Sequence, residues 1–184
     1  DLIERGVVTN ATHGAWRGVS VTGALIGTER LYRFAHENPA VLMCGSATTH
    51  SEAVLSALPG LVSINSAIEV DLTGQVNAEA AGGAYLGGTG GQVDYVRGAS
   101  RSPGGRSIIV LPATARGLSR IVSRLAGPVT TARSEVDVVV TEYGAAELRG
   151  RDLAARARAM IAIAHPDLRT GLEAEAAELF ARGY

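Results

Sequence analysis

Short runs of β-branched and other apolar residues alternate with helix-period segments along most of this chain. The apolar runs span 19–26, 41–44, 61–68, 108–111 and 136–140. The helix-period segments between them span 28–37, 51–58, 92–98 and 118–125. Several runs are apolar on consecutive residues, which is typical of parallel strands buried on both faces. The alternation therefore predicts an α/β fold with an open, mostly parallel sheet flanked by helices.

The end of the chain is expected to form a helical hairpin. Two segments rich in Ala, Leu, Glu and Arg, 151–164 and 166–182, are predicted helices. The break falls at His165-Pro166, because proline removes a backbone donor inside a helix but is favourable in a first turn. Asp167 would then lie at the positive end of the second helix dipole. Because neither a repeat nor a linker interrupts the pattern, we expect residues 1–184 to form one domain.

The composition of the chain excludes some classes of binding partner and some types of catalysis. The formal net charge is -1, with 19% charged residues, which does not favour nucleic acid as a partner. No apolar stretch approaches the roughly 18 residues that cross a bilayer, so we expect no membrane partner. All 17 basic residues are arginine, which excludes imine chemistry on a lysine of this chain. A lone cysteine, Cys44, fits a reducing, cytoplasmic setting, and the four histidines lack metal-ligand spacing, so no metal site is expected.

The first six residues look like the end of a helix. Residues 1–6 end in Gly6, as a last helical turn closed by glycine would, and no initiator methionine is present. We therefore interpret the chain as part of a longer protein.

A glycine-rich segment is the strongest local feature. Six of the ten residues from 82 to 91 are glycine, and a predicted helix follows. Glycines let a backbone approach a ligand closely and turn its N–H groups toward it, and a helix start adds partial positive charge. The segment matches neither the dinucleotide-binding fingerprint nor the phosphate-binding loop. By itself it is equally well explained as a flexible loop or a tight crossover.

Several long strings together resemble one family, the acetyl-CoA hydrolase/transferase family, including 4-hydroxybutyrate CoA-transferases. In chain order they are SINSAIEVDLTGQVNAE (63–79), GGQVDYVRGA (90–99), RSIIVLPAT (106–114), VTEYGAAELRG (140–150) and IAIAHPD (161–167). The resemblance covers nearly the whole chain and corresponds to the C-terminal domain of such enzymes.

The resemblance implies an enzyme with two related α/β halves and an active site between them. Such enzymes move CoA from an acyl donor to a small carboxylate, with acyl-CoA as substrate and no permanently bound cofactor. A glutamate attacks the thioester, forms a mixed anhydride and then carries CoA as a glutamyl thioester. In the family this glutamate precedes the segment that matches residues 1–6. The N-terminal half is then a partner absent from this chain, and we expect the chain alone to be inactive.

The same resemblance assigns CoA-binding roles to residues of this chain. Gly88, Gly90 and Gly91 would offer backbone N–H groups near the thioester oxygen. Asn65, with its neighbour Ile64, would line the CoA channel at a strand end. The alternative for Asn65 is a residue that caps a strand turn.

A basic residue and an acidic residue complete the expected site. Arg116, Arg120 and Arg124 are spaced four residues apart in a predicted helical segment, which would place them on one face. Of the three, Arg120 is the preferred ligand of the CoA phosphates. The alternative is a solvated basic helix face. Glu142, after the last apolar run, would orient the active-site network or the acceptor. Its alternative is a charge at a helix start, because a helical run is expected from Gly144.

Three functions remain open at this point. A CoA-transferase and an acyl-CoA hydrolase differ in whether a carboxylate or water accepts the acyl group, and the sequence does not distinguish them. A non-catalytic CoA-binding domain is the third reading. The acyl donor and acceptor are not readable from the sequence, and a homo-oligomer is compatible with it.

Overall fold

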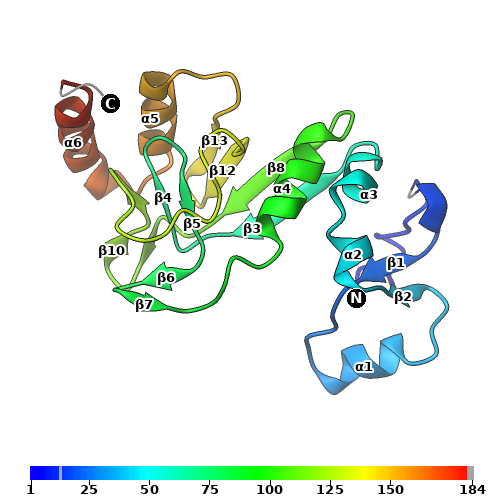
Figure 1. Ribbon diagram of the computed structural model, residues 1–184. Coiled ribbons are helices and arrows are strands. Elements are labelled where there is room, and N and C mark those ends of the chain that lie inside the picture. Colours follow the sequence, from blue (N-terminus) through cyan, green and yellow to red (C-terminus); the bar gives the residue numbers. More distant parts are fainter. Residues whose placement is uncertain (13, 182–184) are drawn as a thin grey trace.

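A four-stranded sheet organises the fold of this computed structural model, which describes residues 1–12 and 14–181 (Figure 1). The strand order is β13-β12-β8-β3. The strands are Val62–Ser66 (β3), Arg106–Val110 (β8), Val138–Thr141 (β12) and Gly144–Glu147 (β13). β3, β8 and β12 are parallel, whereas β13 returns antiparallel to β12. This confirms the predicted open, mostly parallel α/β sheet.

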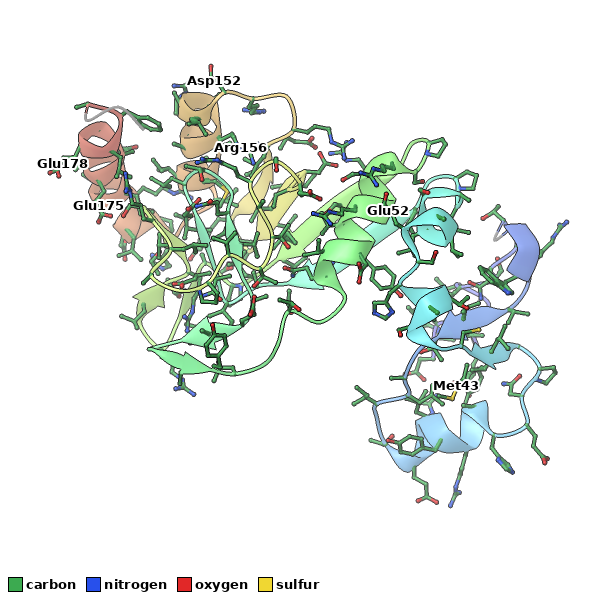
Figure 2. The ribbon with its side chains drawn as sticks, in the orientation of Figure 1. Met43, Glu52, Asp152, Arg156, Glu175 and Glu178 are labelled. Atoms are coloured by element: carbon green, nitrogen blue, oxygen red, sulfur yellow. The ribbon has the colours of Figure 1, made fainter. Side chains whose placement is uncertain are left out.

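Helices cover one face of this sheet. Ile109 and Val139 are register partners on β8 and β12, and both are fully buried. They belong to one core cluster with Val96 of α4 (Gln92–Arg101) and Met160 of α5 (Leu153–Ala162). α3 (Glu52–Ser56) packs beside α4. An ion pair between Glu52 of α3, which is labelled in Figure 2, and Arg101 of α4 joins the two helices.

The opposite face of the sheet is apolar and exposed along β3 and at the end of β8. Val62 and Ile64 of β3 are 50% and 69% exposed, and Val110 of β8 is 39% exposed. The three residues share one face because side chains alternate along a strand and Ile64 pairs with Ile108 in the parallel register. Parallel sheets are normally covered on both faces, so this part of the face lacks a cover among residues 1–12 and 14–181.

Residues 1–12 and 14–50 form a separate small layer to one side of the sheet (Figure 1). Its elements are a 3₁₀ turn at Gly14–Trp16, β1 (Ser20–Thr22), α1 (Glu29–Ala35), β2 (Val41–Met43) and α2 (Ser46–Thr49). β1 and β2 pair in parallel. Among the residues of this layer whose burial is described, only Thr49 is buried. The layer therefore contributes little to the core.

Short strands surround the carboxyl end of the sheet. They are β4 (Glu69–Asp71), β5 (Val76–Asn77), β6 (Ala80–Ala81), β7 (Ala84–Tyr85), β9 (Thr114–Ala115), β10 (Leu118–Ser119) and β11 (Ile121–Val122). The apolar run 61–68 forms a strand only as far as Ser66, the last residue of β3. The chain then enters a second sheet, of order β11-β4-β5.

The predicted helix 118–125 is wrong. Arg116 and Gly117 both have positive φ, 53° and 77°, and turn the chain from β9 into β10 as a two-residue hairpin. Ile121 then pairs with Val70 of β4, and both side chains are fully buried. Burial in this long-range strand pair outweighs the local helical spacing. The helical run expected from Gly144 is also wrong, because this segment is β13.

The C-terminal helical hairpin is present as predicted. α5 begins at an Asp152 cap, whose side chain accepts a hydrogen bond from Ala155 N at 2.7 Å. A 3₁₀ turn, Pro166–Leu168, leads into α6 (Arg169–Ala181), and the predicted end at Arg182 lies outside the described residues. Within the described part of the chain, no helix is both long and apolar enough to span a bilayer.

Candidate functional site

The glycine segment, residues 82–91, contains the turn of the β6–β7 hairpin, the strand β7 and the link from β7 to α4 (Figure 1). Gly82 and Gly83 have φ of 58° and 80°, which is the conformation of a two-residue hairpin turn. The amides of Leu86 and Gly87 then donate to the carbonyl of Glu79, at 2.7 and 3.3 Å. The glycine segment is thus held at its first half by backbone hydrogen bonds.

The second half of the glycine segment presents unused donors. The four consecutive amides from Gly88 to Gly91 donate to no acceptor within the described chain. Gly88 to Gly90 are exposed, and Gly91 is half-buried immediately before α4. No side chain caps the start of this ten-residue helix. Free amides and an uncapped helix start make this a favourable place for an anion or a developing oxyanion.

Gln92 anchors the start of α4 at the edge of the main sheet. Its Nε2 donates to the carbonyl of Ser66, the last residue of β3, at 2.8 Å. Its Oε1 accepts from Thr131 Oγ1 at 2.9 Å, and the side chain is buried. Sequence reasoning included Gln92 in a family string but missed its anchoring role and that of Thr131. No local signal identifies Thr131, because its partner lies far away in sequence.

A buried polar network supports the β6–β7 hairpin below the glycine segment. Asn77 Nδ2 donates to Glu69 Oε1 and to the carbonyl of Ala80, both at 2.8 Å. Thr130 Oγ1 donates to Glu79 Oε1 at 2.8 Å. Glu69 and Glu79 are therefore structural acceptors here. The network holds the hairpin, and with it the first half of the glycine segment, in one position.

Glu142 lies in the turn that follows β12. Its Oε2 accepts a hydrogen bond from the amide of Ala113 at 2.8 Å. This backbone bond lowers the pKa of Glu142 below its ordinary value of 4.5, and its own backbone amide and the nearby His165 act in the same direction. Glu142 is exposed and stays ionised at neutral pH. It is not a helix-start charge, because the chain continues into β13.

Arg120 lies between β10 and β11, so the expected row of three arginines on one helix face does not exist. Its amide donates to the carbonyl of Ala113 at 2.8 Å, and its carbonyl accepts from the amide of Val70 at 2.9 Å. Ala113 therefore links the backbone of Arg120 to the carboxylate of Glu142. A contact between Arg120 and CoA phosphates stays a prediction.

Ile64 and Asn65 point to opposite faces of β3. Ile64 lies on the exposed apolar face described above, whereas Asn65 is half-buried on the other face. Asn65 Nδ2 is buried and has no acceptor within the described chain. Buried amides normally have partners, so this donor is available to a ligand or a further part of the protein. The two side chains do not line one wall together, and their assignment to one CoA channel stays a prediction.

The parallel register gathers these features at one edge of the sheet. β3, β8 and β12 are neighbours in that order, and their carboxyl ends coincide. Ser66, which binds the start of α4, and Thr141, which precedes Glu142, are therefore roughly 10 Å apart, or two strand spacings. Ligands of open α/β sheets bind beyond this edge. Across residues 1–12 and 14–181, no group of three or more His, Cys, Asp or Glu could hold a metal ion.

The comparisons with known proteins agree on one family. A model of the acetyl-CoA hydrolase/transferase C-terminal domain matches residues 27–176. The chain is 45% identical over 176 residues to the 4-hydroxybutyrate coenzyme A transferase of Clostridium kluyveri, covering 94% of this chain and 41% of that protein. It is 39% identical over 122 residues to an acetyl-CoA hydrolase of Candida albicans, covering 62% of this chain and 22% of that protein.

Solved structures give the same result. The crystal structure of RipA from Yersinia pestis superposes with a TM-score of 0.92 at 40% identity, covering 97% of this chain and 41% of that chain. The 4-hydroxybutyrate CoA-transferase of Porphyromonas gingivalis superposes with a TM-score of 0.83 at 40% identity, covering 96% and 42%. The chain thus spans about two fifths of the length of these relatives.

Proposed function

Because this chain belongs to the acetyl-CoA hydrolase/transferase C-terminal domain family, we propose that the protein containing it transfers CoA between an acyl-CoA and a small carboxylate. The relatives with the higher identities are named as CoA-transferases, among them succinyl-CoA:acetate/propanoyl-CoA:succinate CoA transferase of Fasciola hepatica at 44% identity. The observation that carries the proposal is the row of free amides from Gly88 to Gly91 at the carboxyl edge of the sheet. Localisation in the cytoplasm and a homo-oligomeric state stay predictions.

The proposed chemistry divides between this chain and a second half of the enzyme. A glutamate outside this chain attacks the thioester carbonyl, the C–S bond breaks, and CoA leaves as a thiolate. The thiolate then attacks the resulting anhydride and forms a glutamyl-CoA thioester, releasing the carboxylate. The amides of Gly88, Gly90 and Gly91 stabilise the oxyanion, and the loss of one such donor typically costs about 3 to 4 kcal/mol. Without the glutamate, this chain alone is inactive.

Glu142 is proposed to orient the site. Glu142 is ionised at neutral pH, and its bond to Ala113 lowers its pKa further. An ionised carboxylate repels the carboxylate of an acceptor substrate. It therefore serves better as a fixed hydrogen-bond acceptor for the amide of Ala113 than as the group that binds the acceptor substrate. Of the two expected roles, orienting the active-site network or orienting the acceptor substrate, we therefore propose the first.

The exposed face of the main sheet supports the presence of a second half. Val62, Ile64 and Val110 form an apolar surface on parallel strands, which are otherwise covered on both faces in α/β proteins. The relatives are more than twice as long as this chain. We therefore expect the N-terminal half of the enzyme to cover this face.

A turnover assay tests the transferase proposal. The protein containing this chain is incubated with acetyl-CoA or butyryl-CoA, with and without acetate, succinate or 4-hydroxybutyrate. New acyl-CoA species and free thiol are measured separately. New acyl-CoA that depends on the carboxylate is expected. Free thiol released equally without any carboxylate would instead support the acyl-CoA hydrolase reading, and neither product would refute both.

Gly88→Ala tests the glycine segment itself. A Cβ atom at Gly88 would meet no atom within 4 Å, and its φ is ordinary, so the change should not disturb the fold. We expect turnover to fall at least tenfold because the methyl group keeps the thioester from the amides. Gly171→Ala on α6 is the matched control, because a Cβ atom there also meets open space. Equal turnover in both variants would contradict the assignment of Gly88.

A further inference from the structure

The imidazole of His50 lies against the backbone at the end of the glycine segment. A Cβ atom at Gly91 would lie 2.1 Å from His50 Cδ2 and 2.2 Å from His50 Nε2. Real Cβ atoms do not approach other atoms so closely, and the ring edge is therefore in direct contact with Gly91. His50 directly follows α2, so this contact ties the N-terminal layer to the start of α4.

The ring of His50 is held from two other sides. Its Nδ1 lies 2.8 Å from Thr49 Oγ1, at hydrogen-bond distance. The ring also packs against the ring of Tyr95 of α4 in an edge-to-face arrangement, with ring centroids 5.2 Å apart and an interplanar angle of 78°. Thr49 is buried and Tyr95 is half-buried. These contacts fix the ring so that its Cδ2–Nε2 edge is the part that faces Gly91.

Three glycines of the segment differ in what requires a glycine at their position. Gly88 has ordinary φ and open space, so nothing among the described residues requires glycine there. Gly90 has open space but a φ of 56°, which disfavours other residues. Gly91 has an ordinary φ of -96°, yet a Cβ would collide with His50. The requirement at Gly91 thus comes from the imidazole and not from the backbone conformation.

We propose that His50 is a positioning residue for the glycine segment. By packing against Gly91 and Tyr95, it sets the point at which the segment enters α4, and with it the direction of the free amides of Gly88 and Gly90. Its effect on CoA rests on the proposed function, whereas its contact with Gly91 does not. His50 acts through the glycine segment and is not assigned a step in the chemistry.

A double-mutant cycle on stability tests the contact. Thermal midpoints are measured for the wild type, His50→Ala, Gly91→Ala and the double variant, in the protein that contains this chain. We expect Gly91→Ala to lower the midpoint more than His50→Ala, and the double variant to melt higher than Gly91→Ala, because removal of the ring makes room for the new methyl group. If Gly91→Ala does not fold, recovery of folding in the double variant gives the same answer.

A matched control uses a histidine without this contact. His36, which follows α1, is exposed, so His36→Ala combined with Gly91→Ala should give no recovery. Additive losses in the His50→Ala/Gly91→Ala variant, or equal recovery with His36→Ala, would overturn the proposed contact.

Binding of CoA tests the positioning role. We expect His50→Ala to weaken CoA binding by roughly 2- to 30-fold in calorimetric titration, the range typical of residues that act through a neighbour. The imidazole NMR signals of His50 should shift when CoA is added, and those of His36 should not. Unchanged affinity and unshifted His50 signals would overturn the role. A wild-type protein that binds no CoA would overturn the role and the proposed function together, while recovery in the stability cycle would still establish the contact.

Discussion

Replacement of Arg156 is expected to destabilise the fold strongly, because this buried guanidinium joins three segments. Arg156 lies on α5, one turn after the Asp152 cap (Figure 2). Its Nε donates to the carbonyl of Thr73 at 2.6 Å, Nη1 to Leu148 at 3.0 Å and Nη2 to Arg133 at 2.6 Å. The residue is only 7% exposed, and this burial lowers the pKa of Arg156.

The expected magnitude follows from these three bonds. Arg156→Met keeps the length of the side chain but removes all its donors. Each buried carbonyl that loses its partner costs about 1 to 3 kcal/mol, and removal of a desolvated charge offsets part of the total. We therefore expect a loss of about 3 to 5 kcal/mol in the free energy of unfolding. For a chain of this size this corresponds to a fall of about 6 to 20 °C in the thermal midpoint.

Urea unfolding followed by circular dichroism measures this change. Arg158→Met is the control, because Arg158 lies on the same helix and is exposed. We expect the control to change the free energy of unfolding by less than about 0.5 kcal/mol. A loss below about 1 kcal/mol for Arg156→Met would refute the reasoning, since the three carbonyls would then find other donors at little cost.

Three further predictions concern the edge and the open face of the sheet. Glu142→Gln should lower the thermal midpoint at pH 7, and the difference should shrink as pH falls below 4.5, because a lowered pKa stabilises the fold only while the carboxylate is ionised; a pH-independent difference would contradict this. The double variant Val62→Ser/Val110→Ser should reduce self-association of the isolated chain in light scattering. Its thermal midpoint should stay within about 3 °C of the wild type, because both side chains are already exposed. Unchanged association would argue against an interface at this face. Gln92→Leu should cost about 1 to 3 kcal/mol in urea unfolding, because Ser66 and Thr131 lose a buried partner; an exposed control such as Arg97→Leu would lose less.

Elements with strong local patterns were predicted well. The run 136–140 and the segment 92–98 correspond to β12 and α4, because consecutive apolar residues and helical spacing agree there with the burial that the fold provides. The segment 118–125 failed because Ile121 is buried beside Val70, a residue far away in sequence. Short strands such as β6 and β9 carry too few residues for a pattern to identify them.

The site residues that the sequence indicated stay predictions. The sequence indicated Asn65 and Glu142 at strand ends and the glycine segment before a helix, and the parallel register brings the strand ends to one edge. It did not indicate that Gln92 anchors α4 or that Ala113 binds Glu142. Both bonds join residues from different strands and loops, and no spacing along the chain reveals them.

The sequence alone determined the α/β class, the parallel character of the main strands and the family, because these depend on local periodicity and on long strings of residues. Tertiary structure decided which donors remain free and why Gly91 must be glycine. An amide is free only when no acceptor lies within reach of it. Gly91 must be glycine because the ring of His50, from the N-terminal layer, lies against it. Such properties depend on distances between residues far apart in the chain, which only packing determines.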